Sequence, residues 1–177
     1  MIARTRIVGV AAVLLSALVV AACDSRSAAG NRAAGSDAFP ELTRPVNDFA
    51  GVIDDTAARA MEAQIQGLQR DTGAVVIVAT LRTCAPVTDI RACSMAVFEN
   101  HGKGIGQRGK DRGVLLLLVL DDRQVRITTG YGMERVIPDA RALEIVNEMT
   151  PSFRGARYGE GLRHGLDRIA TEIRRVR

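Results

Sequence analysis

Two continuous apolar stretches decide the fold of this chain, Ala74-Val-Val-Ile-Val-Ala-Thr80 and Val114-Leu-Leu-Leu-Leu-Val-Leu120. Neither stretch alternates between apolar and polar residues, as a strand with one face in water would. Each is therefore predicted to be a β-strand buried on both faces. A sheet built around two such strands needs helices on both of its sides.

The segments around these strands supply the helices. Apolar residues recur at helical spacing over about 56–70, 89–101 and 158–176, which predicts amphipathic helices, and a further helix is predicted over about 139–149. The segment Gln124–Thr129 alternates instead, which is typical of an antiparallel neighbour nearer the edge of the sheet. We therefore predict an α/β fold, a three-layer α/β/α sandwich with a small mixed sheet.

The N-terminal residues predict an exported protein that carries a lipid. Arg4 and Arg6 precede an apolar run that is too short for a typical membrane-spanning helix but fits a signal peptide. The run ends in Val20-Ala-Ala-Cys23, which resembles the lipobox of bacterial lipoproteins, in which the cysteine takes up a diacylglycerol. Residues 1–22 are interpreted as a lipoprotein signal peptide and Cys23 as the lipidation site. The alternative is a secreted protein cleaved after Ala22.

The segment after the cysteine predicts a tether. Residues 23–38 are mostly small or polar and show no apolar periodicity, so we expect a flexible link between the lipid and a single domain over 39–177. The resulting protein would be lipid-anchored in the cell envelope, facing the periplasm or the cell exterior. Asp24 resembles an inner-membrane retention signal, but that rule varies between bacterial groups, and the choice between inner and outer membrane stays open.

Composition argues against nucleic acid and nucleotide as partners. Without residues 1–22 the chain has 22 basic and 20 acidic residues, and it has no Trp and two Tyr for base stacking. The segment Gly104-Ile-Gly-Gln-Arg-Gly109 matches the letters of a dinucleotide-binding motif. That motif follows a strand and opens a helix, whereas this segment follows a predicted helix and opens a strand.

Cys84 and Cys93 are predicted to form a disulfide. In an exported domain two cysteines tend to pair, and this pair would join the loop before a helix to its first turns. Two separate buried thiols are the alternative. A metal site is less well supported, because no histidine or further cysteine stands at ligand spacing.

Four acidic residues fall at the ends of predicted elements, where distant segments can converge: Asp48, Asp111, Glu134 and Asp139. Clustered carboxylates repel one another unless a cation lies between them, and oxygen ligands suit Ca²⁺ or Mg²⁺. The residues alone also allow simpler roles. Asp139 could cap a helix, Asp48 and Asp111 could stabilise turns, and Glu134 could face solvent.

The order of four motifs strongly resembles the TPM-domain family over about residues 39–175. The motifs are Val46-Asn-Asp-Phe-Ala-Gly-Val-Ile53, Asp111-Arg-Gly-Val-Leu-Leu-Leu-Leu118, Gly130-Tyr-Gly-Met-Glu134 with Ile137-Pro-Asp139, and Pro151-Ser-Phe153 with Tyr158-Gly-Glu-Gly161. The resemblance implies the same α/β/α sandwich. The family includes exported bacterial proteins and thylakoid-lumen proteins linked to photosystem II repair.

The resemblance also implies a function. Several family members bind divalent ions, so Asp48, Asp111, Asp139 and Glu134 become candidate ligands for Ca²⁺ or Mg²⁺. We expect a membrane-tethered module that assists assembly, repair or regulation of membrane-protein complexes, with a membrane-protein partner. A metal-assisted acid phosphatase is the alternative. Many bacterial relatives continue into a transmembrane helix, whereas this chain stops at Arg177, so we expect the lipid to replace that anchor.

Overall fold

The structure, a computed structural model, describes residues 36–106 and 111–176, which belong to one unit of the chain. The predicted signal peptide, Cys23 and most of the predicted tether lie outside the described residues. None of the helices within the described residues has the length and apolar character needed to cross a membrane.

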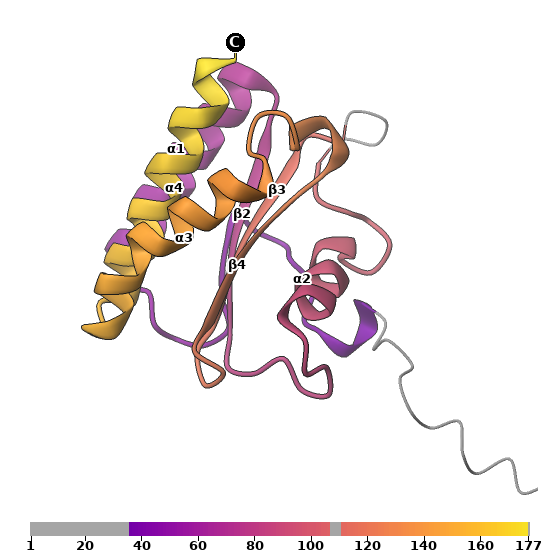
Figure 1. The fold of residues 1–177 in the computed structure, drawn as a ribbon, viewed down its shortest axis with the longest axis vertical. Helices are drawn as coiled ribbons and strands as arrows, with labels where there is room; N and C mark the ends of the chain where they lie inside the picture. Colours follow the sequence, from indigo (N-terminus) through magenta and orange to yellow (C-terminus); the bar gives the residue numbers. More distant parts are fainter. Residues whose placement is uncertain (1–35, 107–110, 177) are drawn as a thin grey trace, which may run out of the picture. The chain divides into compact units, whose positions relative to one another are not determined.

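Within the described residues, four strands form one sheet in the order β1-β2-β3-β4 (Figure 1). The strands are β1 Val46–Asp48, β2 Val75–Leu81, β3 Gly113–Val119 and β4 Gln124–Thr129. The first three run parallel, and β4 pairs antiparallel with β3. The predicted mixed sheet is confirmed. The short strand β1 adds an element that the sequence patterns did not indicate.

The central strand β3 is buried along its whole length. All seven of its residues are buried, and it pairs over seven positions with β2 on one side and over six with β4 on the other. Full burial of one leucine side chain contributes about 1.5–3 kcal/mol of hydrophobic free energy. The run of four leucines therefore gives β3 a large share of the core.

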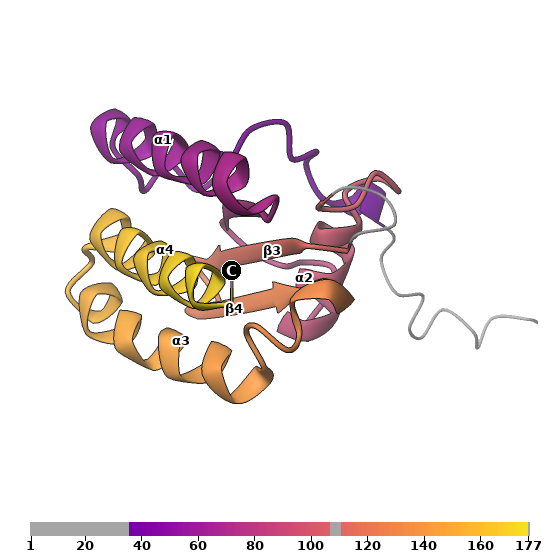
Figure 2. The same ribbon diagram turned by 90° about the horizontal axis from the view of Figure 1, so that it is seen from above.

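Helices cover both faces of the sheet (Figure 2). Within the described residues, α2 packs on one face, while α1, α3 and α4 form the layer on the other. The α-helices are α1 Asp55–Thr72, α2 Ile90–Glu99, α3 Asp139–Arg154 and α4 Tyr158–Arg175, and short 3-10 helices span Ser36–Ala38 and Tyr131–Met133. The predicted three-layer α/β/α sandwich is confirmed.

Helix α3 extends beyond its predicted end at Met149. The residue before a proline is disfavoured in helical conformation, so Thr150-Pro151 favoured an earlier end. In the structure the Thr150 hydroxyl donates a hydrogen bond to the Val146 carbonyl at 3.0 Å, and the helix continues to Arg154. A side-chain bond thus supports the backbone in the turn that contains the proline.

The segment before β1 is attached to the C-terminal end of α2. The side chain of Asn100 accepts a hydrogen bond from the Leu42 N–H at 2.8 Å and donates one to the Leu42 carbonyl at 3.2 Å. Phe39 and Leu42 are both buried in the core between α2 and the sheet. The packed part of the chain therefore includes Phe39, where the predicted domain begins.

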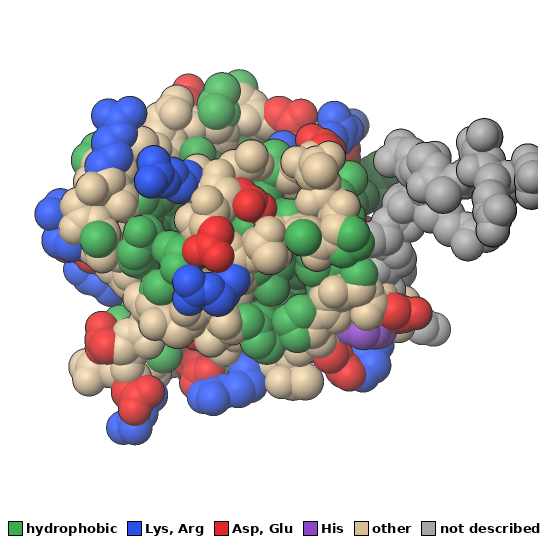
Figure 3. Space-filling model, turned by 90° about the horizontal axis from the view of Figure 1, so that it is seen from below, with side chains coloured by type: hydrophobic (Ala, Val, Ile, Leu, Met, Phe, Trp, Pro, Cys, Tyr) green, Lys and Arg blue, Asp and Glu red, His purple; other side chains and the backbone are tan. Residues whose placement is uncertain are grey.

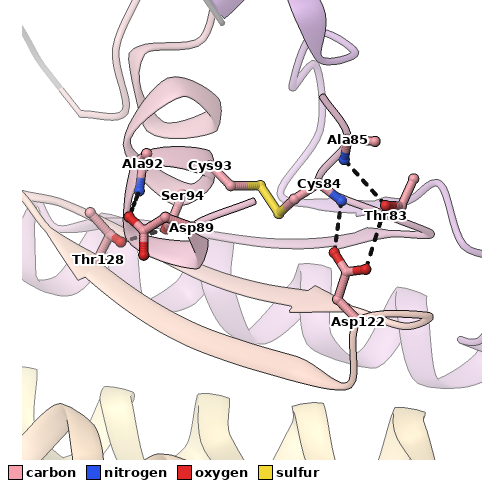
Figure 4. The surroundings of a disulfide bond; sticks show 9 residues. All are labelled: Thr83, Cys84, Ala85, Asp89, Ala92, Cys93, Ser94, Asp122 and Thr128. Carbon is pink, nitrogen blue, oxygen red and sulfur yellow. Dashed lines mark hydrogen bonds between the residues drawn. A yellow bond between two sulfur atoms is a disulfide. The ribbon is translucent and has the colours of Figure 1, made fainter. Parts of the chain in front are cut away.

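Cys84 and Cys93 are joined by a disulfide (Figure 4). The bond links the segment after β2 to the first turn of α2. The Asp122 carboxylate holds the same segment by accepting a hydrogen bond from the Cys84 N–H at 3.0 Å. Closing a short loop in this way stabilises a fold by about 2–3 kcal/mol, mainly by restricting the unfolded chain.

A charged cluster joins α3 to α4, the two helices that lie side by side in both ribbon views. The buried carboxylate of Glu172 accepts hydrogen bonds from Arg141 at 2.6 and 3.0 Å and from Arg175 at 3.1 Å. Burial alone raises the pKa of Glu172. The hydrogen bonds and charge of Arg141, with the charges of Arg175 and Arg168, outweigh burial and lower this pKa from 4.5.

This lowered pKa predicts a stability contribution that is lost in acid. The folded state favours ionised Glu172, so the contribution is present above about pH 4.5 and fades as the pH falls through the lowered pKa. We expect Glu172→Gln to reduce the free energy of unfolding by about 1–3 kcal/mol near neutral pH. Urea unfolding of both proteins as a function of pH should show this difference shrinking below pH 4.5. The exposed Glu99→Gln is the control, and a difference independent of pH would contradict the prediction.

Candidate functional site

A pocket of about 620 Å³ lies at the end of the sheet where β3 begins and β4 ends. Figure 2 looks onto this end of the molecule. Three of the four acidic residues predicted from the sequence line it, Asp111, Glu134 and Asp139. They come from three segments: the approach to β3, the loop after β4, and the first turn of α3.

Backbone contact between two of the sequence motifs positions Asp111. Its carbonyl accepts a hydrogen bond from the Gly132 N–H at 3.0 Å. Gly130 approaches so closely that a β-carbon there would lie 2.4 Å from the same carbonyl oxygen. The loop after β4 can reach Asp111 only because glycine occupies position 130.

Buried side chains hold the other two carboxylates at the pocket. Met133 and Ile137 are buried in the core, and the Ile137 N–H donates to the Met133 carbonyl at 2.8 Å. These anchors leave Glu134 exposed at the pocket. Asp139 is the first residue of α3, where a negative charge interacts favourably with the helix dipole.

Asp48 lies at the opposite end of the sheet. Asp48 of β1 is aligned with Thr80 of β2, and Thr80 is aligned with Leu118 near the end of β3. Asp111 instead precedes Gly113, the first residue of β3. Five residues of extended strand separate Leu118 from Gly113, which corresponds to about 17 Å. The parallel order of β1, β2 and β3 therefore keeps Asp48 apart from the three carboxylates at the pocket.

The carboxylate of Asp48 is occupied by hydrogen bonds within the fold. One oxygen accepts from the N–H groups of Gly51 and Val52 at 3.0 and 3.2 Å and from the Thr80 hydroxyl at 2.5 Å. The other accepts from the Ile53 N–H at 2.8 Å. These bonds fix the turn between β1 and α1, as the turn interpretation of this residue expects.

The end of the sheet near Asp48 also exposes hydrophobic surface. Figure 3 shows this end, opposite to the pocket, with hydrophobic side chains across its middle and acidic and basic groups among them. Phe49, directly after Asp48, is 41% exposed. Nothing in the structure indicates what covers this surface.

The three pocket carboxylates do not form a ready metal site. Within the described residues, no three His, Cys, Asp or Glu side chains lie close enough together to hold a metal ion. Asp111, Glu134 and Asp139 are all exposed, so their side chains are free to rotate. Their chemistry fits an oxygen-coordinated cation, although their orientations in the structure do not converge.

Sequence patterns missed the other wall of the pocket. Arg91, Met95 and Phe98 stand on one side of α2, and Arg126 lies on β4 beside them. A hydrogen bond of 2.5 Å between the hydroxyls of Ser94 and Thr128 holds α2 against β4. The spacing of 91, 95 and 98 along one helix face was a visible signal, but only the fold shows that this face meets β4.

The occupied carboxylate of Asp48 predicts a stabilising role. Asp48→Ala should lower the free energy of unfolding by about 2–4 kcal/mol, because it leaves backbone N–H groups without their acceptor. Thr80→Val should cost less, because it removes one donor to the same carboxylate. Urea unfolding measures both effects, with Glu134→Gln as the exposed control. Equal stability of Asp48→Ala and the wild type would contradict this role.

Comparison with known proteins places the chain in a family. The TPM-domain family model matches residues 46–172. No curated protein matches the chain significantly. The sequence motifs quoted for the family fall at β1 and its following loop, at β3, at the pocket loop, and at the junction of α3 and α4.

Solved bacterial structures share the fold. The N-terminal domain of a protein from P. gingivalis is 27% identical, with a TM-score of 0.69, and the match covers 78% of this chain and 90% of that one. The N-terminal domain of the cg2496 protein from Corynebacterium glutamicum is 16% identical, with a TM-score of 0.57 and coverage of 75% and 82%. The BA42 protein from the psychrophilic bacterium Bizionia argentinensis is 19% identical, with a TM-score of 0.57 and coverage of 68% and 81%. With the family match over its folded part, the chain belongs to the TPM-domain family.

Proposed function

We propose that this TPM domain is a lipid-tethered binding module of the cell envelope that assists assembly, repair or regulation of membrane-protein complexes. In this proposal its pocket also takes a divalent cation. The observation that carries it is that Asp111, Glu134 and Asp139, from three separate segments, line one pocket of about 620 Å³. That volume is in the range of about 300–1,000 Å³ that is usual for ligand sites.

Ca²⁺ fits the pocket chemistry better than Mg²⁺. Ca²⁺ accepts irregular sets of oxygen ligands that include water and backbone carbonyls, whereas Mg²⁺ demands near-octahedral geometry. Asp111, Glu134 and Asp139 are the proposed ligands, and they must rotate toward one another when the ion binds. Asp48 is not proposed as a ligand, because both of its oxygens already accept hydrogen bonds.

A binding role also agrees with the mixed character of the pocket. Arg91 and Arg126 line it together with Met95 and Phe98, so it offers charged and apolar groups side by side. Pockets of this composition recognise ligands through a few polar contacts within an apolar lining. The phosphatase activity implied by the family resemblance stays a prediction.

The cation proposal predicts stabilisation by Ca²⁺. A ligand at 100 times its dissociation constant should raise the free energy of unfolding by about 2.7 kcal/mol, which a thermal scan detects easily. We expect a saturable rise in melting temperature with Ca²⁺ and a smaller one with Mg²⁺. Glu134→Gln and Asp139→Asn should abolish it. Asp121→Asn, an exposed aspartate at the far end of the sheet, should leave it unchanged.

No rise at millimolar Ca²⁺ would remove the cation from the proposal. An equal loss in Asp121→Asn would indicate non-specific binding to surface charge and would also count against the pocket. The tether and the binding role would then need support from other experiments.

The tether predicts that Cys23 determines membrane association. Two or more acyl chains hold a protein firmly at a bilayer, because each buried methylene contributes about 0.8 kcal/mol. In cells, the wild-type chain should sediment with membranes, and Cys23→Ser should move to the soluble fraction of the envelope. Cys84→Ser, which retains Cys23, is the matched control. Membrane association that survives Cys23→Ser would contradict lipid anchoring at this residue.

A further inference from the structure

The outer edge of β4 carries backbone groups that the sheet does not use. In an antiparallel pair, residues alternate between positions bonded to the partner strand and positions whose N–H and C=O groups point away from it. The Gly130 N–H donates to the Gly113 carbonyl at 2.9 Å, which fixes this alternation. By the register of the pair, the backbone groups of Ile127 and Thr129 point outward. Neither residue has a backbone hydrogen-bond partner on that side among the described residues.

The pocket runs along this edge. Its lining includes every residue from Arg126 to Gly130. Successive residues of a strand point to opposite faces of a sheet, so a cavity on one face would touch only alternate residues. A cavity that all of them line therefore reaches the backbone of β4 at its outer edge, and Ile105 and Asp111 extend its lining around the end of the sheet.

The two sides of the pocket offer apolar contacts above and below that edge. Met95 and Phe98 of α2 stand on one side, and Met95 is 47% exposed. Tyr131, which is 83% exposed, stands on the side of the loop that leads to α3. A strand placed along β4 would direct its side chains alternately toward these two walls.

Positive charge is concentrated on the α2 side. Arg91 and Arg126 both line the pocket there, and neither forms an ion pair with any described residue. The Nε atom of half-buried Arg126 is shielded from solvent and has no hydrogen-bond partner among the described residues. A shielded guanidinium donor is costly when it lacks an acceptor, and a carboxylate is the acceptor that it binds best.

We infer that β4 receives an extended peptide segment of a partner protein as a fifth strand. The peptide backbone pairs with Ile127 and Thr129, and an acidic side chain opposite Thr128 lies beside Arg126 and Arg91. Apolar side chains next to it contact Met95 and Phe98. The inference rests on the proposed role as a binding module and names its partner, but it does not depend on the cation.

Charge argues against a second copy of this chain as the occupant. Two copies paired antiparallel through β4 would place both α2 helices on the same face of the joined sheet. Arg91 and Arg126 of one copy would then lie near Arg91 and Arg126 of the second copy. Like charges at close range destabilise a strand pair. An acidic side chain on the α2 side would instead pair with Arg91 and Arg126, because the pocket carboxylates Asp111, Glu134 and Asp139 come from segments outside α2 and β4.

The test measures binding of a synthetic peptide to the full-length purified protein. The probe is a fluorescent peptide of about seven residues that alternates Val and Thr with two Glu on one face, a usual strand length. One control replaces both Glu by Lys. The second keeps every side chain but carries N-methyl groups at the backbone positions that face β4. Fluorescence anisotropy gives the dissociation constants, and hydrogen exchange follows the amides of Ile127 and Thr129.

We expect the Glu peptide to bind roughly tenfold more tightly than either control peptide. It should also protect the amides of Ile127 and Thr129 from exchange. Arg126→Gln and Arg91→Gln should each weaken binding roughly tenfold. Arg135→Gln, an exposed arginine near the pocket that does not line it, should have no effect. Equal binding of the three peptides, or no binding, would overturn the inference.

Two further measurements show which proposal is wrong if the peptide does not bind as expected. Sedimentation of the protein alone would reveal a dimer, and a dimer that protects Ile127 and Thr129 would mean that a second copy occupies the edge and that the inference is wrong. The Ca²⁺ titration on the same preparation separates the two ideas. A retained Ca²⁺ effect without peptide binding overturns only the strand addition, whereas peptide binding without a Ca²⁺ effect overturns only the cation.

Discussion

Burial of β3 on both faces and along both edges is the constraint on which the rest of the structure depends. A strand of this kind forces α2 to one side of the sheet and α1, α3 and α4 to the other, and it requires β2 and β4 as neighbours. It also fixes where the pocket lies. The residues just before β3 and just after β4 meet at one end of the sheet, because the two strands are antiparallel. The pocket at that end is a consequence of this pairing.

The same topology explains why residues that look alike in sequence have different roles. Asp48 follows β1 and Asp111 precedes β3, and in a parallel arrangement those positions lie at opposite ends of the sheet. Asp48 accepts four hydrogen bonds and fixes a turn. Asp111 instead reaches a pocket with its side chain exposed. An acidic motif therefore acquires its role from the direction of the strand next to it.

Much of the fold could be predicted from the sequence, because long apolar runs and helical spacings depend mainly on local residues. The two buried strands and the edge strand were predicted within a residue of their ends. The strand β1 was not, since it has three residues and contains Asn47, whose side chain bonds the backbone of Arg44 instead of following an apolar pattern. The extension of α3 through Pro151 depends on one hydroxyl bond, which no periodicity reveals.

The candidate site was only partly predictable, for a related reason. Asp111, Glu134 and Asp139 each lie within a short contiguous motif that can be recognised directly in the sequence. Arg91 and Arg126 become neighbours only when one face of α2 packs beside one face of β4, and that contact joins segments more than thirty residues apart. Which faces meet is decided by the whole layer arrangement. Side chains contributed by such packing are therefore the ones that sequence patterns miss.

The attachment of Leu42 to Asn100 determines how mechanical load would enter the domain. A pull on the chain from its N-terminal side would act first on the contacts of Asp37 and Phe39 with His101, and then on the two hydrogen bonds between Leu42 and Asn100. Force would therefore pass into the C-terminal end of α2. That helix also forms a wall of the pocket through Met95 and Phe98. A single helix thus connects the N-terminal segment of the domain to a wall of the pocket.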